Sequence, residues 1–262
     1  MIIDLQLNQG SAPWSHLRDA GLAAEAAGFG TLWNLDHFSG DMFGADSMLE
    51  CFTSLTAWAT STSTIGLGTL VVNVMNREPG LLANIVSSVQ QISNNRLTLG
   101  IGAGAAPNTA FSAEQDALKI SLLPKMAQRH ARLGEVVDIM KSVWANDRHE
   151  SFSGFPRPAV QPPIVVGVNS MALAQRAGEF AHGVNTRFNH PERGELLRVA
   201  HEASGMREGF DLSVWSWFDP AFADPAHPFH QELLADGVTR LIMFERGAPN
   251  IDAIASVSTY LR

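Results

Sequence analysis

The chain has 262 residues, a formal net charge of −8, 45% hydrophobic residues and 17% charged residues. That length suits one large core or two small ones, and the apolar fraction excludes a disordered or fibrous chain. The acidic balance provides no basic stripe for a phosphate backbone, so it argues against a nucleic-acid partner.

The cysteine content and the apolar runs set further limits. Cys51 is the only cysteine, which excludes an internal disulfide framework and a metal site built from several thiolates. No apolar run approaches the roughly 20 residues that cross a bilayer, and residues 1–9 lead into a strand-like segment without a basic signal region. We therefore expect a soluble cytoplasmic protein with no membrane partner.

Short apolar, β-branched runs alternate with amphipathic stretches along the whole chain. The predicted strands are Ile2–Leu7, Thr31–Leu35, Thr64–Val72, Arg96–Ile101, Pro163–Gly167, Gly183–Thr186, Leu212–Trp217 and Thr239–Phe244. The helices predicted to follow them are Trp14–Ala27, Ser47–Thr60, Gly80–Ile92, Lys125–Trp144, Met171–Phe180, Pro191–Ser204, Phe229–Ala235 and Asn250–Leu261. In the first helix, apolar residues recur at helical spacing until Gly28 ends it.

Eight such βα units in one run predict an α/β fold, the (β/α)₈ or TIM barrel, as a single domain over residues 1–262. A doubly wound sheet is the alternative, but it requires a Gly-rich fingerprint after the first strand, and Asn8–Gly10 is not one. Two segments interrupt the pattern, Pro107–Leu123 and the Pro-rich Phe152–Pro163. We expect both to be loops over one end of the barrel.

A barrel assembles its active site at the C-terminal ends of its strands, and Asp36 and His37 follow the second predicted strand. Imidazole titrates near neutrality and a neighbouring carboxylate can fix its tautomer, so His37, with Asp36 beside it, is the candidate acid/base. In the alternative interpretation, Asp36 caps the loop and His37 packs against it. Four other histidines lack such a carboxylate and are expected at the surface or in loops: His182, His190, His227 and His230.

Two segments of small residues follow later strands. Gly167–Ser170 lies at a strand-to-helix junction, where free backbone N–H groups favour an anion or phosphate. An ordinary N-cap by Asn169 or Ser170 explains the same residues. The run from Gly100 to Ala106 lets the backbone approach a flat ring closely, or simply relieves crowding at the top of the barrel.

The sequence contains no motif for a metal site or for a serine nucleophile. The acidic residues near His37 match no metal-ligand spacing, so we expect no metal, and no GxSxG nucleophile motif is present. Trp215 and Trp217 are spaced by two and, with Phe218, are typical of a core.

Several segments resemble the bacterial luciferase-like oxidoreductases. They are Ala23–Phe38 (AAEAAGFGTLWNLDHF), Thr64–Leu70 (TIGLGTL), Arg77–Ala83 (REPGLLA), Ile92–Gly104 (ISNNRLTLGIGAG) and Asp236–Ile242 (DGVTRLI). Together they cover predicted strands two to four densely and the rest of the chain loosely. They are specific to the superfamily and not to one member.

The resemblance implies a TIM barrel that binds FMN or the deazaflavin coenzyme F-420 at its C-terminal mouth, usually as a homodimer. It also implies that His37 is the active-site histidine, that Gly167–Ser170 is the phosphate-binding turn, and that a non-prolyl cis peptide lies at Asn73–Val74. The residues implied to bind the coenzyme are Asn73, Val74, Gly102, Ala103, Gly104, Ala105, Gly167, Val168, Asn169 and Ser170.

The Asp-His-Phe sequence and the Thr-Leu-Val-Val strand resemble the deazaflavin branch, which we favour. In sugar-phosphate dehydrogenases of that branch a carboxylate follows the Gly-x-Gly-x-Gly run, so Ala105 argues against that substrate class. An anionic coenzyme on an acidic chain requires local cations, for which Arg77 and Arg187 are candidates.

The leading hypothesis is hydride exchange between F-420 and a small organic substrate, with His37 shuttling the proton. Two alternatives come from other classes. One is an FMN-dependent two-component monooxygenase that activates oxygen, and the other is a non-catalytic flavin-binding barrel.

Overall fold

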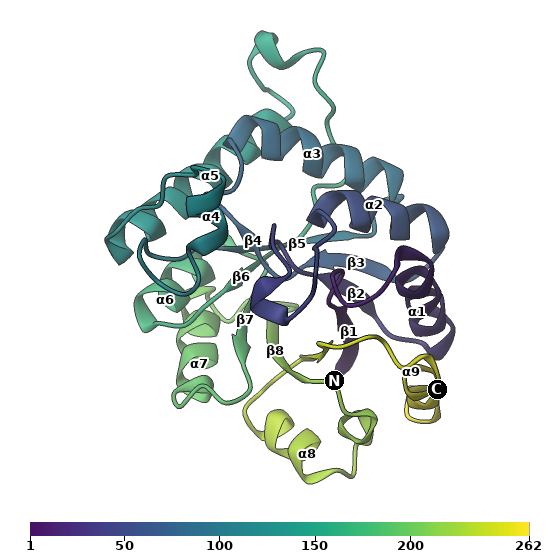
Figure 1. The fold of residues 1–262 in the computed structure, drawn as a ribbon. Coiled ribbons are helices and arrows are strands. Elements are labelled where there is room, and N and C mark those ends of the chain that lie inside the picture. Colours follow the sequence, from purple (N-terminus) through teal and green to yellow (C-terminus); the bar gives the residue numbers. More distant parts are fainter. Residues whose placement is uncertain (262) are drawn as a thin grey trace.

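Nine parallel strands close into one barrel in the computed structural model, which describes residues 1–261 (Figure 1). The strands are β1 Ile2–Leu7, β2 Thr31–Asn34, β3 Gly66–Thr69, β4 Val72–Asn73, β5 Leu97–Gly102, β6 Ile164–Gly167, β7 Gly183–Arg187, β8 Asp211–Trp217 and β9 Arg240–Glu245. They pair in the order β3-β2-β1-β9-β8-β7-β6-β5-β4, and a pairing of β3 with β5 closes the ring. Because β3 and β4 are two parts of one barrel strand, the predicted (β/α)₈ barrel is confirmed.

Helices surround the barrel, and the longer ones turn an apolar face to the outside of the sheet (Figure 1). They are α1 Trp14–Ala27, α2 Cys51–Ser61, α3 Pro79–Ile92, α4 Ala113–Ala117, α5 Met126–Trp144, α6 Met171–Phe180, α7 Arg193–Ala203, α8 Pro228–Ala235 and α9 Ile251–Ser256. The predicted bounds of α1 and α6 agree with the structure. Helix α1 ends at Gly28, whose φ of 92° favours glycine. Within residues 1–261, no helix combines the length and apolarity that crossing a membrane requires.

The core lies between the barrel and its helices. Strand residues such as Leu5, Leu32 and Leu99 are fully buried. They belong to one hydrophobic cluster with helix residues such as Leu17 and Val86. This packed layer holds the strand ends in place, and the loops that follow the strands carry the site.

A buried carboxylate joins the N-terminal ends of four strands. Oδ2 of Asp4 on β1 accepts hydrogen bonds from Trp33 Nε1 at 2.7 Å and from Arg240 Nη1 at 2.6 Å. Arg240 Nε also donates to Asp211 Oδ2 on β8 at 2.6 Å. These bonds tie β1, β2, β8 and β9 together at the end of the barrel opposite the mouth.

The third barrel strand is broken in its middle, which corrects the predicted position of the cis peptide. The non-prolyl cis bond joins Leu70 to Val71, between β3 and β4, and does not join Asn73 to Val74. Asn73 pairs with Gly102 of β5, and the Val74 N–H donates to the Gly102 carbonyl, so the ladder continues at those residues. The interruption falls earlier, between the last pairing of β3 and the first pairing of β4.

The two irregular segments lie at opposite ends of the barrel, so the expectation that both cover one end is wrong. Pro107–Leu123 follows the C-terminal end of β5 and contains α4. Phe152–Pro163 instead leads from α5 to the N-terminal end of β6, and it projects at the top of Figure 1. There Gln90, near the end of α3, donates to the Val160 carbonyl. A loop that follows a helix returns the chain to the start of a strand, which is the end away from the mouth.

Candidate active site

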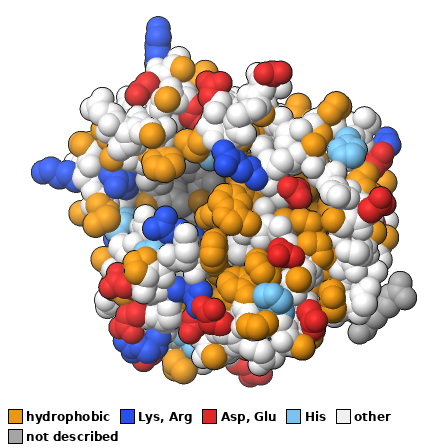
Figure 2. Space-filling model, turned by 60° about the horizontal axis from the view of Figure 1, so that its bottom comes forward, with side chains coloured by type: hydrophobic (Ala, Val, Ile, Leu, Met, Phe, Trp, Pro, Cys, Tyr) orange, Lys and Arg blue, Asp and Glu red, His pale blue; other side chains and the backbone are white. Residues whose placement is uncertain are grey.

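A cavity of about 760 Å³ opens at the C-terminal ends of the strands. Its volume is in the range of small-molecule sites. The face in Figure 2 is hollowed, with hydrophobic side chains and Lys and Arg side chains around the opening. The cavity is lined by Gln6, Leu35, Phe43, Leu70, Val71, Gly102, Ala103, Gly104, Ala105, Phe111, Met126, Arg129, His130, Gly167, Val168, Asn169, Leu173, Asn185, Thr186, Arg187, His190, Trp215, Trp217 and Phe244.

Most of the residues predicted to bind a coenzyme line this cavity: Gly102, Ala103, Gly104, Ala105, Gly167, Val168 and Asn169. Val74 does not, because it is fully buried in the core, and Leu70 and Val71 line the cavity in its place. Asn73 uses its side chain locally, since its Oδ1 accepts the Met75 N–H at 2.9 Å. Ser170 is not among the lining residues, although the preceding Asn169 is.

Val71 forms an apolar surface of the cavity, against the glycines of two neighbouring strands. A Cβ on Gly102 would lie 2.7 Å from Val71 Cγ2, and a Cβ on Gly167 would lie 3.3 Å from Val71 Cγ1. Only residues without a side chain leave this room. The glycines therefore make room for Val71, whose apolar side chain lines the cavity.

Helix α6 begins beside the cavity with polar groups that lack partners. The Ser170 hydroxyl is buried and has no hydrogen-bond partner within the described part of the chain. Ser170 stands at the N-cap, yet neither its side chain nor another makes a capping bond, so the ordinary N-cap interpretation does not hold. The first N–H groups of a helix also lack intrahelical acceptors and carry partial positive charge. This set of donors suits an anionic group.

The charges around the cavity are positive although the chain is acidic. Arg129 and Arg187 line it together with His130 and His190, and no Asp or Glu of residues 1–261 does. Burial lowers the pKa of His130, and nearby Arg129 adds to that effect, so at neutral pH the charge at this place comes from Arg129 and not from His130. Of the two cations predicted for an anionic coenzyme, Arg187 lies in the cavity.

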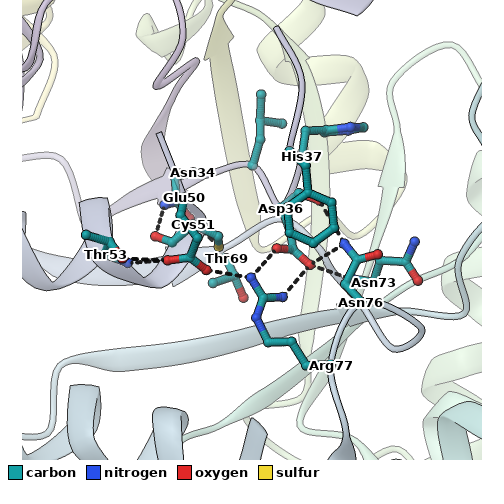
Figure 3. Close-up of polar contacts among 12 residues, drawn as sticks. Asn34, Asp36, His37, Glu50, Cys51, Thr53, Thr69, Asn73, Asn76 and Arg77 are labelled. Carbon is teal, nitrogen blue, oxygen red and sulfur yellow. Dashed lines mark hydrogen bonds and ion pairs between the residues drawn. The ribbon is translucent and has the colours of Figure 1, made fainter. Parts of the chain in front are cut away.

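Arg77, the other predicted cation, is held outside the cavity by carboxylates. Its Nη1 donates to Asp36 Oδ2 at 2.9 Å, and its Nη2 lies 2.8 Å from Asp36 Oδ1 and 2.6 Å from Glu50 Oε1 (Figure 3). Asp36 Oδ2 also accepts the Asn73 N–H at 3.0 Å and Asn76 Nδ2 at 3.1 Å. Asp36 thus anchors the loops after β2 and β4.

His37 does not pair with Asp36, which corrects the expected acid/base arrangement. In Figure 3 the Asp36 carboxylate points toward Arg77 and the His37 ring points away from it. Backbone direction explains this, because successive side chains of an extended segment point to opposite sides. The carboxylate that meets His37 is Glu114 of α4, whose Oε1 lies 2.9 Å from His37 Nδ1.

Glu114 also holds the turn that carries His37. Its Oε2 accepts the N–H groups of Phe38 at 2.7 Å and Ser39 at 3.1 Å. Burial alone raises the pKa of Glu114, but the hydrogen bonds from His37, Phe38 and Ser39 outweigh it and hold that pKa below its usual value. An ionised carboxylate only accepts, so Nδ1 of His37 donates to it and Nε2 is the nitrogen left for proton exchange.

Sequence reasoning missed Glu114 because it lies in a segment interpreted as a loop. The available signal was weak: Ser112 followed by Glu114 and Asp116 is typical of a helix start. The contact itself joins residues 77 positions apart, and no local pattern encodes it.

His190 lies in a loop, as expected, and it also lines the cavity. Two further expectations need correction. His230 is buried, with Nδ1 2.9 Å from the Phe222 carbonyl oxygen. Trp215 and Trp217 line the cavity and do not belong to the core, because they lie toward the C-terminal end of β8, which reaches the mouth of the barrel.

Comparison with known proteins identifies the family. The sequence model of the luciferase-like monooxygenases matches residues 3–227, and the chain belongs to that family. The predicted resemblance is therefore confirmed.

Curated relatives include several proteins named for F-420. An F-420-dependent glucose-6-phosphate dehydrogenase of Microbacterium testaceum is 26% identical over 190 residues, which is 68% of this chain and 54% of the relative. A 5,10-methylenetetrahydromethanopterin reductase of Methanolobus tindarius is 26% identical over 72% of this chain and 55% of its own. An F-420-dependent hydroxymycolic acid dehydrogenase of Mycobacterium tuberculosis is 29% identical over 72% of this chain and 53% of its own. The chain spans about half the length of the curated relatives it matches.

Solved structures share the fold over the whole chain. An F-420-dependent secondary alcohol dehydrogenase in complex with an F-420–acetone adduct superposes with a TM-score of 0.76 at 15% identity, covering 100% of both chains. The tetrahydromethanopterin reductase of Methanopyrus kandleri gives a TM-score of 0.76 at 16% identity, covering 99% of this chain and 97% of that one. At these identities the likeness concerns the fold alone.

Proposed function

We propose that this chain binds the deazaflavin coenzyme F-420 in the cavity and acts as an oxidoreductase on a small organic substrate. The observation that carries the proposal is the buried, unpartnered Ser170 hydroxyl at the start of α6, beside a cavity whose charged side chains are basic. The names of the relatives point to the same coenzyme.

The residues present fit such a coenzyme at two places. Val71, lying on Gly102 and Gly167, provides the apolar surface that a flat ring requires. Ser170 and the first N–H groups of α6, with Arg187 nearby on the lining, provide donors and positive charge for an anionic group. Once bound, the coenzyme supplies the hydride chemistry.

The chain itself positions the reactants and moves a proton. Glu114 fixes the orientation of the His37 ring, so that Nε2 of His37 can donate a proton to, or accept one from, a substrate oxygen. The Asp36–Arg77 pair acts through the backbone, because it holds the loop from which His37 projects. Within the described residues, Asp36, Arg77 and His37 are all outside the cavity lining, but the His37 ring contacts the lining residue Phe43 with centroids 5.1 Å apart and so stands at the cavity's edge.

The first test is a titration of the protein with F-420 and, separately, with FMN, followed by tryptophan fluorescence. Trp215 and Trp217 line the cavity and report on its occupation. Selective low-micromolar binding of F-420 supports the proposal. Selective binding of FMN would favour the two-component monooxygenase instead. Tight coenzyme binding without turnover of any electron donor or acceptor would favour the non-catalytic flavin-binding barrel.

Ser170→Ala tests the anion-binding part of the proposal separately. A buried hydroxyl without a partner costs about 1–3 kcal/mol, so removing it leaves the free protein as stable as before or more so. We expect the dissociation constant of F-420 to rise about tenfold at the same time, because one hydrogen bond to a charged group is lost. Unchanged coenzyme affinity would show that Ser170 does not hold the anion.

The homodimer and the cytoplasmic location stay predictions. Sedimentation of the purified chain, with and without F-420, measures the first directly.

A further inference from the structure

The cavity has two chemically different halves. In the sheet, β2, β1, β9 and β8 are consecutive, and β5, β6 and β7 lie together on the other side. Lining residues from the second side and from α5 include the two arginines and two histidines described above. The first side contributes only uncharged residues, which are Gln6, Leu35, Phe43, Trp215, Trp217 and Phe244.

Four of these six form an aromatic wall, defined as Phe43, Trp215, Trp217 and Phe244. The Phe43 and Phe244 rings meet edge to face with centroids 6.2 Å apart. Trp217 stacks on Phe244 at 5.8 Å, and its edge contact with Trp215 is 5.4 Å. The rings come from the loop after β2 and from β8 and β9, so three separate parts of the chain place aromatic surface on one side of the cavity.

The wall reaches the proton-exchanging residue. The His37 ring contacts Phe43 edge to face, with centroids 5.1 Å apart. At the other end of the wall, Trp217 is 46% exposed. The aromatic wall therefore lies directly beside the residue proposed to exchange the proton.

We infer that the aromatic wall is the substrate subsite and that the substrate is an uncharged, flat, ring-containing alcohol or carbonyl compound. The inference rests on the proposed function for its chemistry. In the alcohol direction, the carbinol C–H bond breaks and its electron pair leaves with the hydride to oxidised F-420. The hydroxyl proton passes to His37, and the carbon–oxygen double bond forms.

The test measures binding of acetophenone and of glucose by ligand-observed NMR, without coenzyme. We expect acetophenone to bind and glucose to bind more weakly, because the wall offers aromatic surface and no charged or hydroxyl partner for a sugar, and because neither probe carries an anion for the basic half of the cavity. Trp217→Ala should raise the acetophenone dissociation constant roughly tenfold, since it removes an aromatic contact and its buried area. Phe155→Ala is the matched control, because Phe155 is 45% exposed and lies outside the cavity lining.

The outcomes separate this inference from the proposed function. Tighter binding of glucose than of acetophenone, or equal acetophenone affinity in Trp217→Ala and wild type, would overturn the aromatic subsite even if F-420 binds. Absence of acetophenone binding would overturn it too. Acetophenone binding that depends on Trp217 in a chain that does not bind F-420 would retain the subsite and reject the coenzyme.

Discussion

His37 is the side chain on which the proposed proton transfer depends. General acid–base catalysis contributes about 10²–10⁴-fold, so His37→Ala should lower oxidation of reduced F-420 by acetophenone at least about a hundredfold. His37 stands at the cavity's edge against Phe43 and is not part of the lining, so the F-420 dissociation constant should change by less than about threefold. His149→Ala serves as control, because His149 is exposed and its side chain, among residues 1–261, bonds within its own turn. Wild-type turnover in His37→Ala would remove His37 from the mechanism.

Glu114 makes a pH-dependent contribution to stability that Glu114→Gln should reveal. Its pKa in the folded chain lies below the usual 4.5, so its stabilising effect is present above about pH 4.5 and disappears as the pH falls through the folded value. Near neutral pH the variant should be about 2 kcal/mol less stable, because hydrogen bonds to a charged group are lost. Urea unfolding across the acid range measures the difference, which should shrink toward low pH.

The exposed pair of Glu135 and Arg132 provides the control for that measurement. Glu135→Gln removes a surface ion pair and should change stability by less than about 1 kcal/mol. For the positioning role of Glu114, the readout is turnover at saturating F-420. A tenfold decrease in Glu114→Gln with unchanged coenzyme affinity is expected, since a misoriented imidazole loses most of its effect. Full turnover would limit Glu114 to a structural role.

At the scale of elements, the contact between Val71 and its neighbouring strands can be tested by a pair of substitutions. Gly102→Ala places a Cβ 2.7 Å from Val71 Cγ2, so Val71 must move into the cavity. We expect a loss of about 1–3 kcal/mol in stability and about a tenfold rise in the F-420 dissociation constant. Adding Val71→Ala removes the colliding methyl group and should restore part of the stability. Equal stability of Gly102→Ala and the double variant would contradict this contact.

Gly167 provides a graded comparison for the same element. A Cβ there would lie 3.3 Å from Val71 Cγ1, so Gly167→Ala should cost less than Gly102→Ala in both stability and affinity. Thermal unfolding and the fluorescence titration together give the order of the two variants.

The regular elements follow from local patterns, and the irregular ones do not. Strand β1 and helices α1 and α6 have the predicted bounds because period and end signals agree there. The break between β3 and β4 has no such signal, since the apolar run continues through it. Helix α4 has only five residues, too few for a helical period to be seen. The turns of small residues at the mouth were predictable, because glycines after a strand allow close approach of the backbone and a serine after a strand is typical of a helix start.

At the scale of the whole molecule, the net charge says little about the site. The chain carries a charge of −8, yet the described cavity lining contains arginines and no carboxylate. The carboxylates near the site are paired with other side chains and do not reach the cavity. Asp36 and Glu50 form ion pairs with Arg77, and Glu114 pairs with His37. Such pairings join residues far apart in the chain, so the sequence alone predicted the residue types of the site but not their partners.

The barrel as a whole has a second pH-dependent group at its closed end. Asp4 is fully buried, its Oδ1 has no partner within residues 1–261, and burial raises its pKa to about 6 although Arg240 opposes the shift. A carboxyl group with a raised pKa binds its proton more tightly in the folded chain. Its effect on stability therefore becomes unfavourable as the pH rises from about 4 to about 6.

Asp4→Asn removes this titration while keeping the shape of the side chain. Folding raises the pKa of Asp4 from 3.8 to about 6. Between about pH 4 and about pH 7, wild type should therefore lose about 3 kcal/mol of unfolding free energy relative to the variant. Urea unfolding at several pH values measures it. Thr31→Val removes another partner of Arg240 without removing a titratable group, so its difference from wild type should not depend on pH. A pH-independent difference for Asp4→Asn would mean that the carboxylate stays ionised beside Arg240, and that the four strands are joined by a permanent ion pair.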